Sequence, residues 1–125
     1  MKILSGMICA PRRSPKSLSA AYASLLSNGW NPILKCEPGT ILPPGDQIYD
    51  VINNTERQGN FWNWINLAQF LVNKAVSGMI QGTPYDGILI CEDDALHTVG
   101  IADFVGSKLW PDDRCGTLSL YCPNV

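Results

Sequence analysis

Short apolar runs and longer amphipathic stretches alternate along the chain. Runs of about four to eight apolar residues bounded by glycine, proline or charge predict strands, and apolar residues spaced i, i+3, i+4 predict helices. The predicted strands cover residues 3–10, 32–36, 48–53, 87–91 and 116–122. The predicted helices cover residues 15–27, 60–77 and 100–110. This alternation predicts an α/β fold, a Rossmann-like three-layer α/β/α domain with a mostly parallel sheet.

Two of these elements carry expectations about burial. The run at 87–91 contains no charge, which predicts a strand buried on both faces of the sheet. The helix that opens at Asn60 has a wide apolar stripe, which predicts a well-covered helix with Trp62 and Trp64 in packed positions. The glycines and proline in residues 78–84 predict its end.

Composition narrows the class of protein. The 125 residues suffice for one domain. Hydrophobic residues make up 46% of the chain and charged residues only 16%, a composition that excludes a disordered chain. A net charge of -2 without a basic run argues against a nucleic-acid partner. No stretch approaches the ~20 apolar residues of a membrane span. The apolar start of the chain is better explained as a first strand than as a signal peptide.

Cysteine spacing bears on the redox compartment. The five cysteines, at positions 9, 36, 91, 115 and 122, form no C-x-x-C pair. An odd number without clustered spacing favours reduced, mostly buried thiols. That pattern is typical of a cytoplasmic protein.

Three carboxylates follow the apolar run at 87–91. Glu92, Asp93 and Asp94 are consecutive, and their mutual repulsion favours a cationic partner. Ligands of open α/β folds bind at the carboxyl ends of strands, and a hard divalent cation prefers oxygen ligands. The triplet therefore indicates a metal site. A solvated loop, or a helix N-cap at Asp94, explains the same residues equally well.

Two further groups could add to such a site. Arg12 and Arg13 follow the first strand and suit a phosphate or a base edge. The alternative is a solvated pair of arginines, which could also form a salt bridge with the acidic loop. His97, the single histidine, could join a metal or lie on the surface. The sequence contains neither G-x-G-x-x-G nor G-x-x-x-x-G-K-[ST], so it supports neither Rossmann dinucleotide binding nor a P-loop.

Five segments, taken in order, resemble the donor-binding half of glycosyltransferases with the GT-A fold, of the DXD-type, family 2-like kind. The segments are S-G-M-I-C-A-P-R-R, S-N-G-W, N-N-T-E-R-Q-G-N-F-W-N-W, G-I-L-I-C-E-D-D-A and T-L-S-L-Y. They span nearly the whole chain, so the resemblance implies a single donor-binding domain over residues 1–125.

The resemblance assigns roles to the residues that match the family's motifs. Asp94 would bind Mn²⁺ or Mg²⁺, which bridges the diphosphate of a nucleotide-sugar, while Asp93 and Glu92 would support the metal or reach the ribose. The remaining matches are Pro11 and Arg13, around the nucleotide base, and Arg57 and Asn60, in a turn that borders the donor site.

The implied activity is metal-dependent transfer of a sugar from a nucleotide-sugar to a hydroxyl of a glycan or another acceptor. Members of the family are about twice as long, and their second half supplies the acceptor site and often a catalytic base. We therefore assign no base. Three explanations are open: a fragment, a degenerate relative, or one part of a split enzyme in which a partner chain supplies the acceptor half. An apolar face left open by its absence would favour a homo-oligomer.

Two other functions fit the same residues. The first is a non-catalytic nucleotide or nucleotide-sugar binding module that keeps the acidic loop. The second is a small α/β protein without a ligand, whose acidic loop is only solvated.

Overall fold

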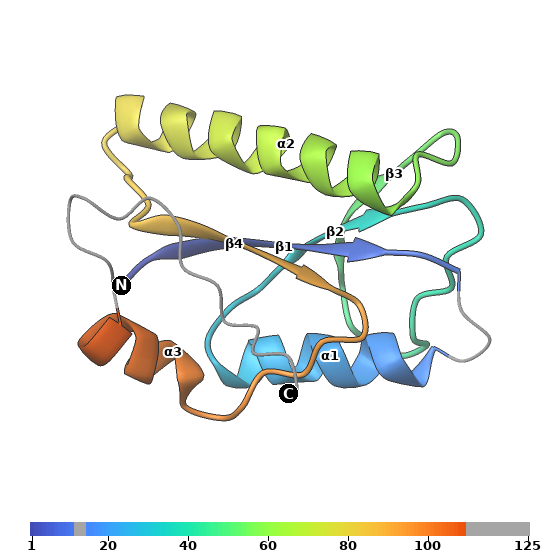
Figure 1. The fold of residues 1–125 in the computed structure, drawn as a ribbon, viewed down its shortest axis with the longest axis horizontal. Coiled ribbons are helices and arrows are strands. Elements are labelled where there is room, and N and C mark those ends of the chain that lie inside the picture. Colours follow the sequence, from blue (N-terminus) through green and yellow to red (C-terminus); the bar gives the residue numbers. More distant parts are fainter. Residues whose placement is uncertain (12–14, 110–125) are drawn as a thin grey trace.

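The computed structural model describes residues 1–11 and 15–109, and within this part the chain forms a three-layer α/β/α domain (Figure 1). The predicted fold class is thereby confirmed. The strands are β1 (Ile3–Cys9), β2 (Ile33–Cys36), β3 (Asp50–Asn53) and β4 (Gly87–Glu92). The helices are α1 (Lys16–Ser27), α2 (Asn60–Ile80) and α3 (Ile101–Phe104), followed by a π-helical turn, η1 (Val105–Leu109).

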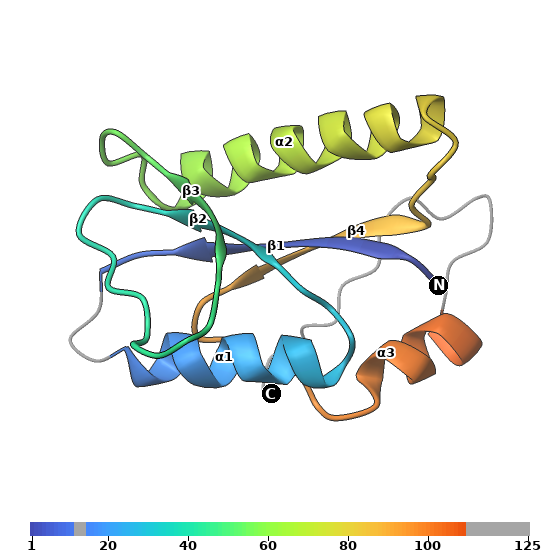
Figure 2. The same cartoon turned by 180° about the vertical axis from the view of Figure 1, so that it is seen from behind.

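The four strands form a parallel sheet in the order β3-β2-β1-β4. α1 connects β1 to β2 in one direction, and α2 carries the chain from β3 back across the sheet to β4. Because such crossovers are right-handed, the two helices lie on opposite faces. α2 covers one face, and α1 and α3 lie on the other (Figures 1 and 2). The strand order reverses between β1 and β4, which makes that gap the topological switch point.

Alternation along the strands divides the core into two clusters. On β1, Met7 and Cys9 pack toward α1, together with Leu25. Leu4 and Ile8 face the other way and pack against α2. Both faces of the central strand are thus buried, as expected for a parallel sheet covered by helices.

A glycine sets how closely α2 approaches the sheet. A Cβ atom on Gly6 would lie 2.9 Å from Cδ2 of Leu67 and 3.0 Å from Cδ1 of Leu71. Both leucines are completely buried. Position 6 therefore has no room for a side chain, and α2 rests directly on the backbone of β1.

α2 ends at Ile80, inside the segment 78–84 predicted to close it, and three residues beyond the predicted helix 60–77, because the helix continues through Gly78. Gly78 is buried, and a Cβ there would lie 2.7 Å from the carbonyl oxygen of Thr83. Thr83 donates its backbone N–H to the carbonyl of Gly78 at 2.7 Å. This glycine is needed for the close return of the chain after the helix, and it does not end the helix itself.

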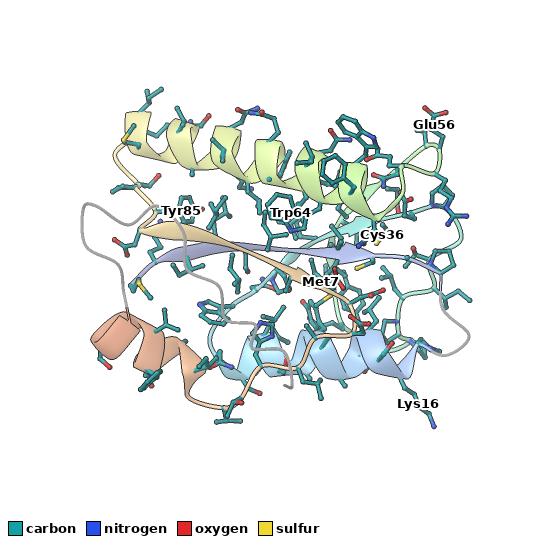
Figure 3. All side chains as sticks on the ribbon, in the orientation of Figure 1. Met7, Lys16, Cys36, Glu56, Trp64 and Tyr85 are labelled. Atoms are coloured by element: carbon teal, nitrogen blue, oxygen red, sulfur yellow. The ribbon has the colours of Figure 1, made fainter. Side chains whose placement is uncertain are left out.

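The predicted burial of β4 and α2 is wrong. Among the described strands β4 pairs with β1 alone, so it forms an edge, and Ile88 is 38% exposed. Trp62 and Trp64 are 59% and 43% exposed. Figure 3 shows Trp64 projecting from α2 toward the sheet. β4 and α2 therefore carry more apolar side chains than the described part of the chain covers.

Other expectations are met or lie outside the described residues. Cys9, Cys36 and Cys91 are buried free thiols, as predicted. The strand predicted at 116–122, with Cys115 and Cys122, lies outside the described residues. Within residues 1–11 and 15–109, no helix combines the length and apolar content needed to cross a bilayer.

Candidate functional site

A crevice of about 370 Å³ opens at the carboxyl ends of β1 and β4, beside the N-terminus of α2. It lies at the switch point, where open α/β sheets bind their ligands. The residues that line it are Ile8, Cys9, Ala10, Pro11, Glu37, Pro38, Arg57, Gly59, Asn60, Asn63, Glu92 and Asp93. The crevice is therefore built from four separate segments of the chain.

One wall of the crevice is the start of α2. Gly59 is the N-cap residue, with φ 79° and ψ 161°. Residues that carry a Cβ atom rarely adopt this backbone conformation. No side chain caps the helix with a hydrogen bond, so its first N–H groups face outward without a cap. Together with the helix dipole, such groups attract anions. Arg57 lines the crevice two residues earlier and adds a positive charge.

A buried carboxylate holds this wall in place. Glu37 is 7% exposed and accepts hydrogen bonds from the backbone N–H of Gln58 at 2.8 Å and of Gly59 at 2.9 Å. The Asn54 side chain also donates to it, at 2.6 Å. Burial raises the pKa of Glu37, but hydrogen bonds from Gly59, Asn54 and Gln58 outweigh burial, and the net pKa is lowered. The carboxylate is thus ionised and fixes the loop that leads into α2.

A buried ammonium group extends the same network. Lys35 is 5% exposed, and its Nζ donates to Oδ1 of Asn63 and Oε1 of Gln58, each at 3.0 Å, and to Oδ1 of Asn54. Burial lowers the pKa of Lys35, while the nearby Glu37 carboxylate acts in the opposite direction. Three side-chain amide oxygens thus replace the hydration of one ammonium group. The network ties β2 to the loop before α2 and to the first turn of that helix.

The opposite wall carries the predicted acidic residues. Asp93 is 2% exposed, and its Oδ2 accepts the backbone N–H of Ala10 at 3.1 Å, which joins the ends of β1 and β4. Glu92 is exposed at the crevice. A turn closed by the N–H of Ala95 and the carbonyl of Glu92, 3.3 Å apart, follows β4. Asp94 lies in this turn, exposed, and does not line the crevice.

Two of the thiols below the crevice, Cys9 and Cys91, are not nucleophiles. Burial raises the pKa of Cys91 to about 12, with the Asp93 and Glu92 charges acting in the same direction. Cys9 and Cys36 are partners in the β1–β2 register, and the hydrogen bond between them raises the pKa of Cys9, as does burial. The same hydrogen bond lowers the pKa of Cys36. Cys9 and Cys91 therefore stay protonated at neutral pH and act as small apolar side chains.

The structure brings most of the predicted site residues together. Pro11, Arg57, Asn60, Glu92 and Asp93 all line the crevice. Arg12 and Arg13 lie outside the described residues. His97 does not line the crevice. Its ring packs edge-on against the ring of Trp30, with 6.0 Å between the ring centroids, and burial lowers the pKa of His97. The site prediction thus identifies both walls but not the network behind them.

The sequence prediction missed Lys35, Glu37 and Asn63. A signal for the first was present, because Lys35 is a lone charge inside the apolar run ILKC. A charge in a buried strand requires a partner, and Glu37 follows it by two residues.

The carboxylates permit a divalent cation only with help from a ligand. No group of three or more His, Cys, Asp or Glu side chains that could hold a metal occurs in the part of the chain that the structure describes. Glu92 and Asp93 nevertheless line one wall together. Mg²⁺ sites commonly use one or two carboxylates and complete the coordination with water and substrate phosphates. The chemistry of this donor pair therefore fits a metal that arrives with a phosphorylated ligand.

Comparisons with models of known protein families, with curated proteins and with solved structures found no match to this chain.

Proposed function

We propose that the crevice binds the diphosphate of a nucleotide-sugar together with a divalent cation, and that the chain is the donor-binding domain of a metal-dependent glycosyltransferase. The observation that carries this proposal is the pairing of opposite charges across the switch point. The uncapped N-terminus of α2 and Arg57 lie on one wall, and Glu92 and Asp93 lie on the other.

The α2 wall suits the phosphates. Backbone N–H groups at a helix N-terminus donate to phosphate oxygens without a side chain between them. A guanidinium group can contact two oxygens at once, which makes Arg57 the natural counter-charge. We expect the Lys35–Glu37 network to keep these donors oriented before the ligand arrives.

The acidic wall suits a cation that accompanies the phosphates. Glu92 and Asp93 would hold it, and it would supply Lewis-acid stabilisation of a departing diphosphate. Without a cation, two carboxylates would repel the ligand that the other wall attracts. Binding should therefore depend on the metal.

Apolar groups complete the crevice. Pro11 and Pro38 line it beside the end of β1. Their rigid rings offer a surface for the base or the ribose of the donor. The crevice, about 370 Å³ in volume, lies within the size range of small-molecule sites.

A second candidate function, binding without turnover, is favoured by one observation. Among the described residues that line the crevice, the third carboxylate is Glu37, and its oxygens already accept three hydrogen-bond donors. Glu37 is thus not available as a catalytic base. Transfer to an acceptor hydroxyl would need a base from another segment or chain, whereas a binding module would not.

Thermal unfolding with UDP, GDP, CDP and their sugars, each with and without Mn²⁺, tests the proposal. A ligand at 100 times its dissociation constant adds about 2.7 kcal/mol to the free energy of unfolding, a shift of several degrees in Tm. We expect one nucleotide to give a Mn²⁺-dependent shift that is lost in Arg57→Ala and Glu92→Gln. The matched controls Lys74→Ala and Glu56→Gln change exposed charges that do not line the crevice and should keep the shift.

Two outcomes would decide against the proposal. The first is the absence of a shift with any nucleotide in a folded protein. The second is a shift that all four variants retain. If a shift occurs, release of free nucleotide from the sugar donor in the presence of acceptors separates the transferase from the binding module.

A further inference from the structure

The exposed flank of α2 carries an apolar seam. Its members repeat with alternating spacings of four and three residues, which is the spacing of a coiled-coil contact. The residues of this seam are Phe61, Ile65, Ala68, Val72, Ala75 and Met79. Phe61 and Met79, at its ends, are 66% and 64% exposed, and Val72, near its middle, is 43% exposed. The whole helix contains one charged residue, Lys74.

The seam lies on the β4 side of α2. At 3.6 residues per turn, its members are displaced by about a quarter of a turn from the buried Leu67 and Leu71. On the opposite flank, Asn63 bonds to Lys35 of β2 and Asn66 to Gln58, so that side faces β2 and β3. The seam thus overhangs the edge of the sheet.

The edge strand continues this apolar surface. Among the described strands nothing pairs with the outer side of β4, and Ile88 is 38% exposed. Ile90 faces α2 and packs beside Leu67 and Leu71. An open strand edge and an apolar helix flank therefore occur side by side.

We propose that this surface binds a second copy of the chain in a two-fold symmetric dimer. The β4 strands of the two copies pair antiparallel, and the two α2 helices pack antiparallel on the same face of the continuous sheet. The proposal does not rest on the proposed function.

The spacing of the elements supports this occupant. Strands lie about 4.8 Å apart, and α2 packs over both β1 and β4. A helix above the gap between β1 and β4 lies half a strand spacing inside β4. The two-fold axis between paired β4 strands lies half a spacing outside β4, so each helix is about one strand spacing from the axis. The two α2 axes would then lie about 10 Å apart, the upper end of the usual helix-packing distance of about 8–10 Å.

The sequence of the seam is self-complementary in this arrangement. An axis near residue 70 places Phe61 opposite Met79 of the partner copy. It also places Ile65 opposite Ala75 and Ala68 opposite Val72, so that small side chains meet larger ones. Such pairing suits the isologous interface of a two-fold dimer, and no seam residue is charged.

The same axis suits the strands. The Asn60–Glu92 hydrogen bond aligns the start of α2 with the end of β4. Ten helical residues extend about 15 Å, which equals four to five residues of strand, so position 70 lies level with residue 87 or 88. Ile88 would therefore lie at or next to the axis, facing its own counterpart.

The chemistry of the surface favours a protein over a membrane. Interfacial membrane helices are rich in Lys and Arg on their polar face, whereas α2 has Lys74 alone. The exposed portions of Phe61, Val72 and Met79 would be buried in addition to the paired edges of the β4 strands.

Light scattering coupled to size exclusion measures the mass of the wild type, Val72→Glu and the matched control Asn73→Glu. The control adds the same charge to an exposed position of α2 outside the seam. We expect a dimer for the wild type and the control and a monomer for Val72→Glu, with circular dichroism confirming that all three are folded.

A cross-link checks the geometry independently of folding effects. With oxidised glutathione, Ile88→Cys should form a disulfide-linked dimer, whereas Ile48→Cys, in a loop and 88% exposed, should not. A monomeric wild type would overturn the proposal. The surface would then have another occupant, either the chain itself or a lipid surface, which binding to phosphatidylcholine vesicles would reveal. A dimer that Val72→Glu leaves intact, or equal cross-linking at both cysteines, would overturn the proposal as well.

Discussion

The side-chain amide of Asn60 donates a hydrogen bond to Oε1 of Glu92 at 3.4 Å. This bond joins the first residue of α2 to the last residue of β4, and thereby connects the α2 wall of the crevice to its acidic wall. Asp93 makes a similar connection from β4 to β1 through the N–H of Ala10. These two hydrogen bonds hold the walls of the crevice together.

The close contact between Gly6 and α2 leads to a stability prediction. In Gly6→Ala, the new methyl group would crowd the side-chain ends of Leu67 and Leu71, so these buried side chains, or the helix that carries them, would have to shift. Overpacking of this kind costs about 1–3 kcal/mol in the free energy of unfolding. Urea unfolding measures the change.

Gly106→Ala is the matched control for this substitution. Its Cβ would meet only the Met1 side chain, at an ordinary 3.4 Å. We expect its unfolding free energy to stay close to that of the wild type. Equal losses in both variants would show that the Gly6 contact is not the cause.

The Lys35 network leads to a second prediction. Lys35→Met leaves the side-chain oxygens of Asn54, Gln58 and Asn63 without their common donor. Asn63 and Gln58 keep second donors in the side chains of Asn54 and Asn66, so the Asn54 oxygen is the one that loses its described donor. Because a part-buried acceptor without a donor is costly, we expect a loss of about 1–3 kcal/mol in the free energy of unfolding, measured by urea unfolding. The double variant Lys35→Met with Asn63→Leu removes both partners of one hydrogen bond of the network. Less than additive destabilisation would support the network, and full additivity would contradict it.

The Glu37 carboxylate leads to a prediction about pH. Its hydrogen bonds lower the pKa in the folded state, so the unfolded chain takes up the proton first as the pH falls below about 4.5. The stability that Glu37 contributes is therefore present at neutral pH and is lost as the pH falls through the folded-state pKa. We expect Glu37→Gln to be less stable at neutral pH and to lose less stability on acidification.

Chemical unfolding at a series of pH values measures this difference. Glu56→Gln is the control, because Glu56 is an exposed carboxylate in the same loop. Parallel stability curves for the wild type and Glu37→Gln across the acidic range would show that Glu37 has no such role.

The sequence pattern was sufficient for the elements and the fold class, because local periodicity determines both. It placed β1, α1, β2 and β3 within about two residues of their observed positions. It placed the end of α2 within residues 78–84, but it did not reveal that Gly78 stays helical and serves a close chain crossing. It also failed for the exposure of Trp62 and Trp64, because an apolar stripe does not reveal which element covers it.

The candidate site divides in the same way. Glu92, Asp93 and Asn60 follow or begin regular elements, so the topology of a parallel sheet brings them to one edge. The partners of Lys35 come from a loop and a helix 19 to 28 residues further along the chain. Such long-range hydrogen bonds leave no periodic trace in the sequence, and only the lone charge in an apolar strand pointed to them.

NMR titration of the labelled protein with the nucleoside diphosphate selected by thermal unfolding, in the presence of Mg²⁺, tests the central claim most directly. Amide resonances report on each wall separately. We predict that the largest shifts fall on Gly59, Asn60 and Phe61, with a second group at Glu92 and Asp93, and that omission of Mg²⁺ abolishes both. Shifts confined to residues outside the crevice, or none at saturating nucleotide, would contradict the account.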